Sequence, residues 1–382
     1  MTVDPATVEN ADSPNLIGLN RPALEAYFDR LGEKPFRASQ VLKWMHQFGV
    51  CDFDSMTNLS KPLRTKLAAH ARISTPRVLR EQIAKDGTRK WLLAMDEKNS
   101  IEMVYIPEAD RGTLCVSSQV GCALNCAFCS TAQQGFNRNL STAEIVGQLW
   151  LATRLLAPRV GHDARAVTNV VLMGMGEPLL NFDAVTDALD IMQEDFAYGL
   201  AKKRITLSTA GVVPGIDRLA ARAPVSLAIS LHAPNDPLRD ELVPINKKYP
   251  IRVLLDACRR YVAGQPKQKI TFEYVMLDGI NDSPQQARQL VALLSNVPAK
   301  VNLIPFNPFP NSPYKRSKWS TIDRFRDVLM AKGITTVTRR PRGDDIDAAC
   351  GQLVGLVEAR SEKMRKRRAE NALANPITLS LP

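Results

Sequence analysis

The chain has 382 residues, of which 45% are hydrophobic and 23% charged, a composition typical of a globular protein with one large domain or two. Its formal net charge of +11 favours a polyanionic partner such as nucleic acid. The first residues show no basic start followed by an apolar run, and no apolar stretch approaches the length of a bilayer span. We therefore expect a cytoplasmic location and no membrane partner.

The first hundred residues predict a small accessory domain. Residues 1–20 are polar and interrupted by proline, and we expect them to be disordered. Apolar positions at three- and four-residue steps predict helices over 22–32, 37–49 and 61–70. Alternating residues around the turn pair Asp86-Gly87 predict a hairpin within 81–108. Residues 21–105 are thus expected to form a helical domain with a short sheet.

Residues 106–355 alternate apolar strands with helices, which predicts an α/β core. A parallel sheet covered by helices on its outer face is typical of this pattern. Six strand–helix units are too few for a closed eight-fold barrel, so we expect a partial (β/α)6 barrel. Residues 356–382 are interpreted as a basic C-terminal tail. The strands are expected over 113–119, 170–174, 205–211, 225–233, 270–277 and 301–307, with a possible extra strand at 334–340.

Three cysteines in the run GCALNCAFCST carry the strongest chemical signal. Cys122, Cys126 and Cys129 are spaced Cys-x3-Cys-x2-Cys, so their thiolates can hold three corners of an iron–sulfur cluster. Because a full thiolate set for a 4Fe–4S cluster is four, one iron would stay open. The alternatives are structural zinc, for which a fourth ligand is not obvious, and core cysteines that bind no metal. Disulfides are not expected for seven cysteines in a chain with no secretory segment.

Polar residues follow the other predicted strands. Active sites of parallel α/β barrels lie at the carboxyl ends of the strands, so these residues are expected to share one rim with the cysteine loop. They are Gly174-Met175-Gly176-Glu177-Pro178, Ser208, Ser230-Leu231-His232 and Asn307.

These motifs resemble the radical S-adenosylmethionine (SAM) superfamily, and within it the RlmN family. The cysteine spacing with Phe128 before the last cysteine is the superfamily signature. The resemblance extends from about Arg21 to about residue 355. It is carried by LCVSSQVGCALNCAFCSTAQQGFNRNL, NVVLMGMGEPLLN, LAISLHAPND, LIPFNPFP and RGDDIDAACGQL.

The resemblance implies an enzyme that methylates carbon 2 of adenosine in 23S rRNA and adenosine 37 of tRNA. It implies that the open iron of the 4Fe–4S cluster binds SAM, which an electron then splits into methionine and a 5′-deoxyadenosyl radical. Gly176 and Glu177 would hold the SAM ammonium. Further hydrogen bonds to SAM would come from Ser208, Ser230, Leu231, His232 and Asn307.

The resemblance also assigns roles to three further residues. Cys350 matches the residue that takes a methyl group from one SAM, and the radical made from a second SAM then acts on that S-methyl group. Cys115 matches the thiol that helps to remove the ring proton and resolves the protein–RNA bond through a transient disulfide with Cys350. Glu102 matches the proton acceptor. From the residues alone, Cys115 is a buried strand cysteine and Glu102 a surface carboxylate.

The partners implied are 23S rRNA, tRNA and an electron donor such as flavodoxin or ferredoxin, and a monomer is the default oligomeric state. The helical domain is interpreted as the RNA-binding accessory. Its candidate contacts, each equally well a solvated or core residue, are Arg37, Lys43, Lys61, Arg64, Lys66 and Trp44.

Two other functions remain as alternatives. Cfr-like enzymes methylate carbon 8 of the same rRNA adenosine with the same cysteines, although AQQGFNRNL and LIPFNPFP favour carbon 2. An iron–sulfur protein that binds RNA or carries electrons without catalysis would need four cluster ligands and would not need Cys115 or Cys350.

Overall fold

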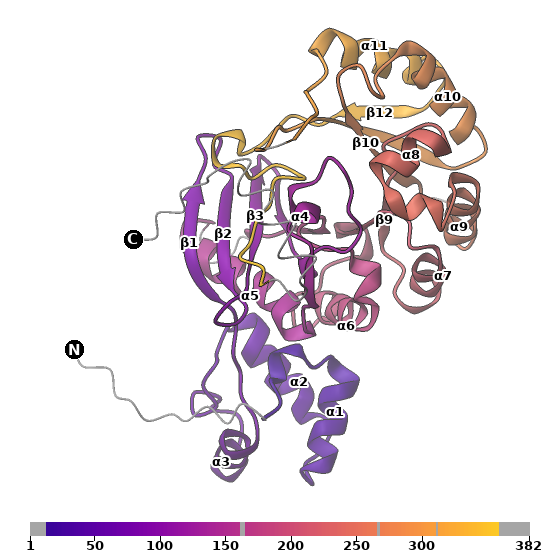
Figure 1. Ribbon diagram of the computed structural model, residues 1–382. Helices are drawn as coiled ribbons and strands as arrows, with labels where there is room; N and C mark the ends of the chain where they lie inside the picture. The colour runs from indigo at the N-terminus through magenta and orange to yellow at the C-terminus, as the bar shows by residue number, and fades with distance from the viewer. Residues whose placement is uncertain (1–12, 161–164, 266–267, 311, 359–382) are drawn as a thin grey trace.

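A computed structural model describes residues 13–160, 165–265, 268–310 and 312–358 (Figure 1). The N-terminal part is a helical domain with its own core. Helix α1 begins after Asn20, whose side chain accepts a hydrogen bond from the Ala23 amide at 3.1 Å. Ser60 caps α3 in the same way through Leu63. The elements are η1 (Leu16–Gly18), α1 (Arg21–Arg30), α2 (Arg37–Leu42), the π-helical turn η2 (Lys43–Gln47) and α3 (Lys61–His70).

Residues 13–20 differ from the expectation of disorder. Leu16 and Ile17 are fully buried in the core of the helical domain. The Leu16 amide donates to the Arg72 carbonyl at 2.9 Å, which ties this segment to the end of the domain. Two apolar residues in a polar stretch were too weak a pattern to predict this packing. Residues 1–12 and 359–382, which include most of the expected tail, lie outside the described residues.

The core is built on one ten-stranded sheet in the order β1-β2-β3-β4-β7-β8-β9-β10-β11-β12. The first four strands are antiparallel, and those from β4 to β12 are parallel. β1 and β12 are the two edges. The strands are β1 (Arg77–Ile83), β2 (Arg89–Ala94), β3 (Ser100–Glu108), β4 (Arg111–Cys115), β7 (Asn169–Leu172), β8 (Ile205–Thr209), β9 (Ser226–Ser230), β10 (Ile270–Met276), β11 (Ala299–Pro305) and β12 (Thr335–Thr338).

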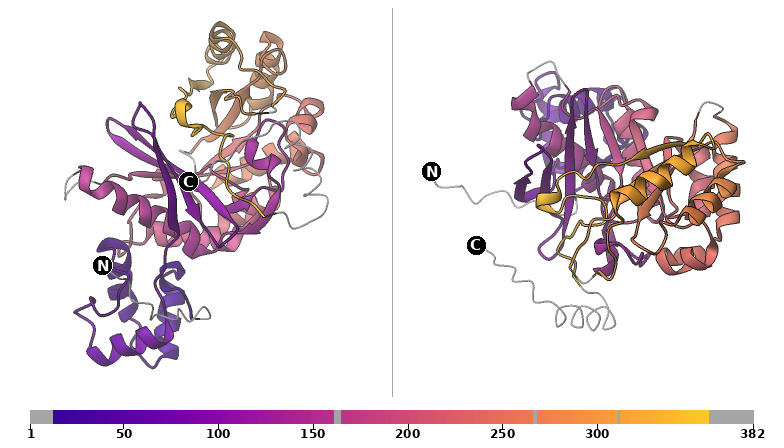
Figure 2. Two further views of the ribbon diagram at one scale, coloured as in Figure 1. Left: turned by 60° about the vertical axis from the view of Figure 1, so that its left-hand side comes forward. Right: turned by 90° about the horizontal axis from the view of Figure 1, so that it is seen from above.

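Helices cover the outer face of the parallel strands, which gives the predicted partial barrel (Figure 2). The extra strand expected at 334–340 is present as β12. The predicted hairpin turns at Asp86-Gly87, but β1 to β3 continue the barrel sheet. The helices are α5 (Thr142–Val160), α6 (Phe182–Gln193), α7 (Val213–Arg222), α8 (Asp236–Leu242), α9 (Ile251–Ala263), α10 (Pro284–Leu294) and α11 (Trp319–Met330), with short turns η3 (Pro178–Leu180), η4 (Lys202–Arg204), η5 (Pro244–Lys247) and η6 (Asp344–Ile346).

The strand expected over 113–119 ends early, at Cys115. The chain then leaves the main sheet because the Ser117 side chain donates to the Glu102 carbonyl at 2.7 Å and accepts from the Met175 amide at 2.8 Å. Residues beyond it form a separate small hairpin of β5 (Gln119–Gly121) and β6 (Phe136–Asn139), with helix α4 (Ser130–Gln133) between its strands. This hairpin holds the loop of three cysteines.

The helical domain packs against the barrel helices α5 and α6 (Figure 1). Asn20 donates to Asp187 at 3.0 Å and to Asp190 at 3.1 Å on α6. Trp150 on α5 donates to the Met45 carbonyl at 2.8 Å. Within the described ranges, no helix has both the length and the apolar character that a bilayer crossing requires.

Candidate active site

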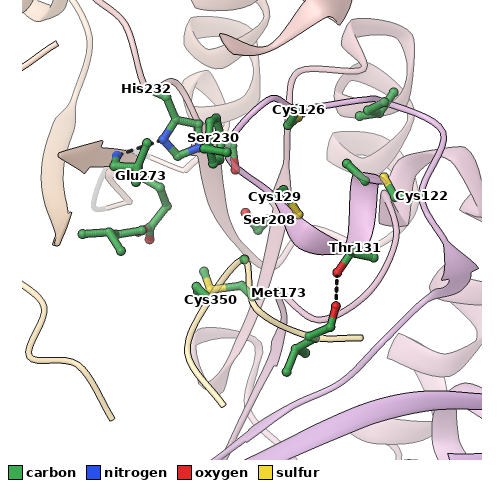
Figure 3. Close-up of a pocket in the computed structure, with 18 of the residues that line it drawn as sticks. Cys122, Cys126, Cys129, Thr131, Met173, Ser208, Ser230, His232, Glu273 and Cys350 are labelled. Atoms are coloured by element: carbon green, nitrogen blue, oxygen red, sulfur yellow. Dashed lines mark hydrogen bonds between the residues drawn. The ribbon is translucent and has the colours of Figure 1, made fainter. Parts of the chain in front are cut away.

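A pocket opens at the carboxyl ends of the barrel strands (Figure 3). The cysteine loop forms one side of it, and the loops that follow β7, β8, β9 and β11 form the others. Most of the residues expected at the site line this pocket, as the arrangement of parallel strands predicted. They are Cys122, Cys126, Cys129, Gly176, Glu177, Ser208, Ser230, His232, Asn307 and Cys350.

The cysteine loop follows a tight crossing of two glycines. Gly121 has a φ of +73°, and a Cβ there would lie 1.8 Å from the Gly135 carbonyl oxygen. The Cys122 amide then donates to that carbonyl at 3.0 Å. Asn125 adopts a left-handed φ of 53°, which turns the chain between Cys122 and Cys126. The hairpin and this turn bring all three thiols to the pocket wall.

The three thiols fit an iron–sulfur cluster in donor chemistry. All are free, and they line one pocket. Burial raises the pKa of the Cys122 thiol to about 12 and that of Cys126 well above its usual range, so thiolates here need a cationic partner. Soft sulfur ligands are the type that iron–sulfur clusters use, and three of them would hold three corners of a 4Fe–4S cluster. Within the described ranges, no three His, Cys, Asp or Glu side chains meet as closely as one metal ion requires.

Glu177 is a buried carboxylate held in a fixed position. Its Oε1 accepts from the Leu179 amide at 3.1 Å and its Oε2 from the Ala210 amide at 2.8 Å. Gly176 before it has a φ of +99°, and a Cβ there would lie 2.5 Å from the Cβ of Gln119. Burial raises the pKa of Glu177 to about 7. A carboxylate with few neighbouring cations in a dry site attracts an ammonium group.

His232 contributes a neutral imidazole to the pocket. Its backbone has a left-handed φ of 61°, and its Nδ1 accepts from the Val275 amide at 3.0 Å. That bond assigns the ring proton to Nε2. Burial lowers the pKa of His232 to about 3, and the Phe128 ring packs edge-on at 4.5 Å between centroids. The ring therefore offers one fixed N–H donor.

The remaining expected cofactor contacts occupy the strand ends. Ser208 lies near the end of β8 and Ser230 ends β9. Asn307 follows β11, and its Oδ1 accepts from Arg316 at 2.9 Å, which leaves its amide nitrogen to face the pocket side. Leu231 is fully buried and does not line the pocket, and its backbone amide donates to the Glu273 carbonyl at 3.1 Å.

Arg239 supports these strand ends from behind, and sequence reasoning missed it. It is fully buried and donates to the carbonyls of Ala210 at 2.7 Å, Ser230 at 3.1 Å and Leu231 at 3.1 Å. These bonds join the loops after β8 and β9. An arginine in the helical run PLRDELV gives no sequence signal for burial, because its partners are backbone carbonyls from other strands.

Cys350 and Cys115 lie at the same end of the barrel. Cys115 is buried at the end of β4, and burial together with the nearby Cys350 raises its pKa to about 12. Cys350 reaches the pocket from a loop near the end of the described chain, where Gly351 has a φ of +86°. Arg339 donates from Nη1 to the Cys350 Sγ at 3.0 Å. This contact was not expected from sequence.

The loop that carries Cys350 is fastened on two sides. On the side of the cysteine loop, the Ser130 amide donates to the Gly351 carbonyl at 2.7 Å, and the Thr131 hydroxyl donates to the Leu353 carbonyl at 2.8 Å (Figure 3). On the β3 side, Ser100 accepts from the Leu356 amide at 2.7 Å. The loop thus spans the gap between the cysteine loop and the antiparallel strands.

Glu102 lies behind this loop and does not line the pocket. It is buried, its Oε1 lies 3.0 Å from the Lys90 ammonium, and its Oε2 accepts from the Val354 amide at 2.8 Å. Lys90 also donates to the Asp347 carbonyl at 3.2 Å. Lys90 therefore binds the chain before Cys350, at Asp347, and Glu102 binds it after Cys350, at Val354. Burial raises the pKa of Glu102, and Lys90 opposes that rise.

Comparisons with known proteins agree with this arrangement. The family model described as "Ribosomal RNA large subunit methyltransferase N-terminal domain" matches residues 14–73, and that of the radical SAM superfamily matches residues 116–291. The chain is 58% identical over 357 residues to the dual-specificity RNA methyltransferase RlmN of Marinobacter nauticus, covering 93% of this chain and 96% of that one. The crystal structure of a radical SAM methyltransferase from Sphaerobacter thermophilus superposes with a TM-score of 0.83 at 44% identity, covering 89% of this chain and 99% of that one.

Proposed function

Because this chain belongs to the RlmN family of radical SAM RNA methyltransferases, we propose that it places a methyl group on carbon 2 of adenosine in 23S rRNA and in tRNA, with Cys350 as the carrier of the methyl group. Two SAM molecules are consumed for each methyl group. The observation that carries the proposal is the convergence of two cysteine systems on one pocket. Three thiols come from the loop after β5, and Cys350 faces them from the opposite loop.

The residues of the pocket fall into cluster ligands and SAM contacts. Cys122, Cys126 and Cys129 would hold the 4Fe–4S cluster, which when bound supplies the electron that cleaves SAM. Glu177 would bind the SAM ammonium, because its carboxylate is fixed by two backbone amides and faces the pocket. His232 and Asn307 would orient SAM through N–H donors. Because Gly176 has no Cβ, the backbone here can pass close to the Gln119 side chain.

Cys350 and Cys115 would handle the carbon and the ring proton. Cys350 accepts the first methyl group at its Sγ and later joins it to the adenine ring. Cys115, whose thiol lies behind Cys350 at the end of β4, would then resolve the protein–RNA bond. Glu102 is retained as the proposed proton acceptor of the family, although its side chain sits behind the loop rather than in the pocket.

The helical domain is proposed to bind RNA. Phe36 and Phe48 are about half exposed, and each lies under a basic side chain, Arg37 at 4.7 Å and Lys43 at 5.5 Å from the ring centroids. Exposed rings beside cations suit stacking on bases and contact with phosphates. Of the contacts expected from sequence, Arg64 and Lys66 donate to backbone carbonyls of their own domain instead, and Trp44 donates to Asn58 at 2.6 Å.

The proposals on the electron donor, the oligomeric state and the location rest on charge and on the free thiols. The pocket needs an electron from outside, and a small acidic donor such as flavodoxin or ferredoxin would suit a chain of net charge +11. A monomer is proposed as the simplest state. A cytoplasmic location would keep the free thiols reduced.

The decisive experiment maps the product. The full chain is reconstituted with iron and sulfide without oxygen and incubated with SAM, a strong reductant and RNA containing the target adenosine. The RNA is then digested and the methylated nucleoside identified by mass spectrometry. Methyl on carbon 2 and release of 5′-deoxyadenosine are expected, with Cys350→Ala as the inactive control. Methyl on carbon 8 would contradict the proposal and support the Cfr-like reaction instead. The 58% identity to an RlmN argues against that reaction.

A further inference from the structure

Among the described residues that line the pocket, Arg339 is the one strongly basic side chain, and the chemistry above does not use it. It follows β12, and its backbone amide donates to the Leu303 carbonyl at 2.8 Å, which fixes the start of the side chain. Its Nη1 donates to the Cys350 Sγ at 3.0 Å. A guanidinium that close to a sulfur stabilises the thiolate over the thiol, because the hydrogen bond strengthens when the acceptor carries a charge.

The groups around Arg339 make its interaction with Cys350 specific. The charges that act on it are those of Cys350, Glu273 and Cys115, with Cys350 the strongest. Glu273 is buried and is held by Asn302 at 2.7 Å. Cys115 is enclosed by the strands, and its burial keeps it in the thiol form, while Cys129 is the other thiol near Cys350. Arg339 thus hydrogen-bonds to Cys350, while Cys115 stays a buried thiol.

We propose that Arg339 is a catalytic residue that holds Cys350 as a thiolate nucleophile for the first methyl transfer from SAM. The inference rests on the proposed function, in which Cys350 accepts that methyl group. A lone pair of the Cys350 thiolate forms the new S–CH3 bond. The bond between the methyl carbon and the SAM sulfonium breaks, and its electron pair stays on that sulfur. No proton is released, and both products are uncharged at sulfur.

This balance explains why a guanidinium suits the step. The anionic thiolate and the cationic sulfonium neutralise each other as the methyl moves, so Cys350 no longer attracts Arg339 afterwards. Glu273 then remains as the acidic group beside Arg339. A lysine would keep the charge but lose the planar donor geometry.

The test measures the thiol itself. Full-length, reconstituted, unmethylated protein is treated with iodoacetamide under anaerobic conditions between pH 6 and pH 9. Alkylation of Cys350 is followed by peptide mass spectrometry. The exposed Cys51 in the helical domain gives an internal reference rate in each sample. The variants are Arg339→Gln, Arg339→Lys and, as a matched control, Arg340→Gln at the exposed next position.

The expected result is that Arg339→Gln slows Cys350 alkylation relative to Cys51 by at least about tenfold near pH 7. Arg339→Lys should keep most of the rate, and Arg340→Gln should match the wild type. A variant that fails to fold would expose Cys350, so its alkylation would be faster than in the wild type and not slower. In that case the comparison of Arg339→Lys with the wild type tests the proposal. Equal rates for wild type and Arg339→Gln would overturn the proposal, as would a Lys variant as slow as Gln.

A second readout separates this inference from the proposed function. Incubation with SAM should add a methyl group to Cys350 in the wild type and far less in Arg339→Gln. If the wild type methylates RNA on carbon 2 but the two proteins alkylate alike, Arg339 has no such role. If the alkylation difference is found while no RNA is methylated, the thiolate role stands and the proposed function fails.

Discussion

The backbone amide of Ser130 donates a hydrogen bond of 2.7 Å to the carbonyl of Gly351. Ser130 directly follows Cys129, and Gly351 directly follows Cys350. One main-chain bond therefore couples a proposed cluster ligand to the proposed methyl carrier. The Thr131 hydroxyl strengthens the link through Leu353. The positions of Cys129 and Cys350 are set together, so a SAM molecule held at the proposed cluster would meet Cys350 in a fixed orientation.

The Lys90–Glu102 pair should control the Cys350 loop. Both side chains are less than one tenth exposed, and Glu102→Gln leaves the Lys90 charge buried without its partner. We expect a loss of about 3–5 kcal/mol and a lower thermal unfolding temperature. Methylation of Cys350 should also slow, because the bond to Val354 weakens.

Lys90→Met is the matched control for this effect, since it removes the cation and leaves the carboxyl to Val354. Lys90→Met should lower the thermal unfolding temperature less than Glu102→Gln does. A Glu102→Gln protein that melts normally and methylates Cys350 at the wild-type rate, but no longer methylates RNA, would instead support a role limited to proton acceptance.

SAM binding should depend on pH through Glu177. Burial raises the pKa of this carboxyl to about 7, so below that pH the free site holds a neutral acid that must lose its proton to bind an ammonium. SAM affinity should rise as the pH increases from 6 to 8, by up to about tenfold per unit below the pKa. Equilibrium binding to the reconstituted protein measures this. Glu177→Gln should bind weakly and show a flatter profile, and an equally steep profile would refute the assignment.

Loss of Cys115 should trap an intermediate. Without this thiol, the bond between RNA and Cys350 cannot be resolved, so Cys115→Ala should accumulate RNA covalently attached to the protein. A denaturing gel followed by peptide mapping measures the adduct. Cys258→Ala, which removes a core cysteine on α9 away from the pocket, should turn over normally. Recovery of free RNA alone from Cys115→Ala would rule out the resolving role.

The exposed rings of the helical domain should contribute to RNA affinity. Phe36→Ala and Phe48→Ala should each weaken binding by about 1–3 kcal/mol, because a stacked base loses its ring. Fluorescence titration with a substrate RNA fragment measures this. Trp319→Ala removes a ring of similar exposure on α11, far from this domain, and should leave the affinity unchanged (Figure 1). Equal losses in all three variants would argue against a dedicated surface.

The joint between the domains should weaken in acid because of His46. Burial and Arg154 lower the pKa of this imidazole to about 3, and its Nδ1 lies 3.2 Å from the Tyr198 hydroxyl on the barrel side. The unfolded chain binds this proton below pH 6.5, so stability is fully present above that pH and is lost as the pH falls toward 3. The loss approaches about 1.4 kcal/mol per pH unit.

Thermal unfolding between pH 7 and pH 5 tests this dependence. His46→Phe keeps the ring volume but removes the titration, so its melting temperature should change less over that interval. The same slope in both proteins would show that other groups dominate the acid response.

The sequence predicted the barrel and most of the pocket because both depend on local patterns. Apolar runs mark strands such as β9 and β10. Residues that follow such strands must gather at one rim once the sheet is parallel. The rim residues Glu177, His232 and Asn307 were therefore correctly placed together.

The contacts of three basic residues could not be predicted. Lys90 and Arg239 are buried and Arg339 is half-buried, and each is held by a partner on another strand or loop: Glu102, the Ala210 carbonyl and Cys350. An isolated lysine or arginine in a chain is normally solvated, so only the tertiary structure identifies these three. Leu231 was expected at the site by resemblance, but its side chain turns into the core, while its neighbours Ser230 and His232 line the pocket.

The two free edges of the sheet bear on which substrates can enter. In the described part of the chain, β1 and β12 end the strand order and do not pair with each other. A fully closed ring of strands admits only what fits down its axis, which suits detached metabolites. Here the segment after β12 bridges the two edges, since the Gly343 amide donates to Asp86 at 3.2 Å and the Lys85 amide donates to Asp345 at 3.1 Å. The ring is therefore completed at this point by loop contacts and not by strand pairing.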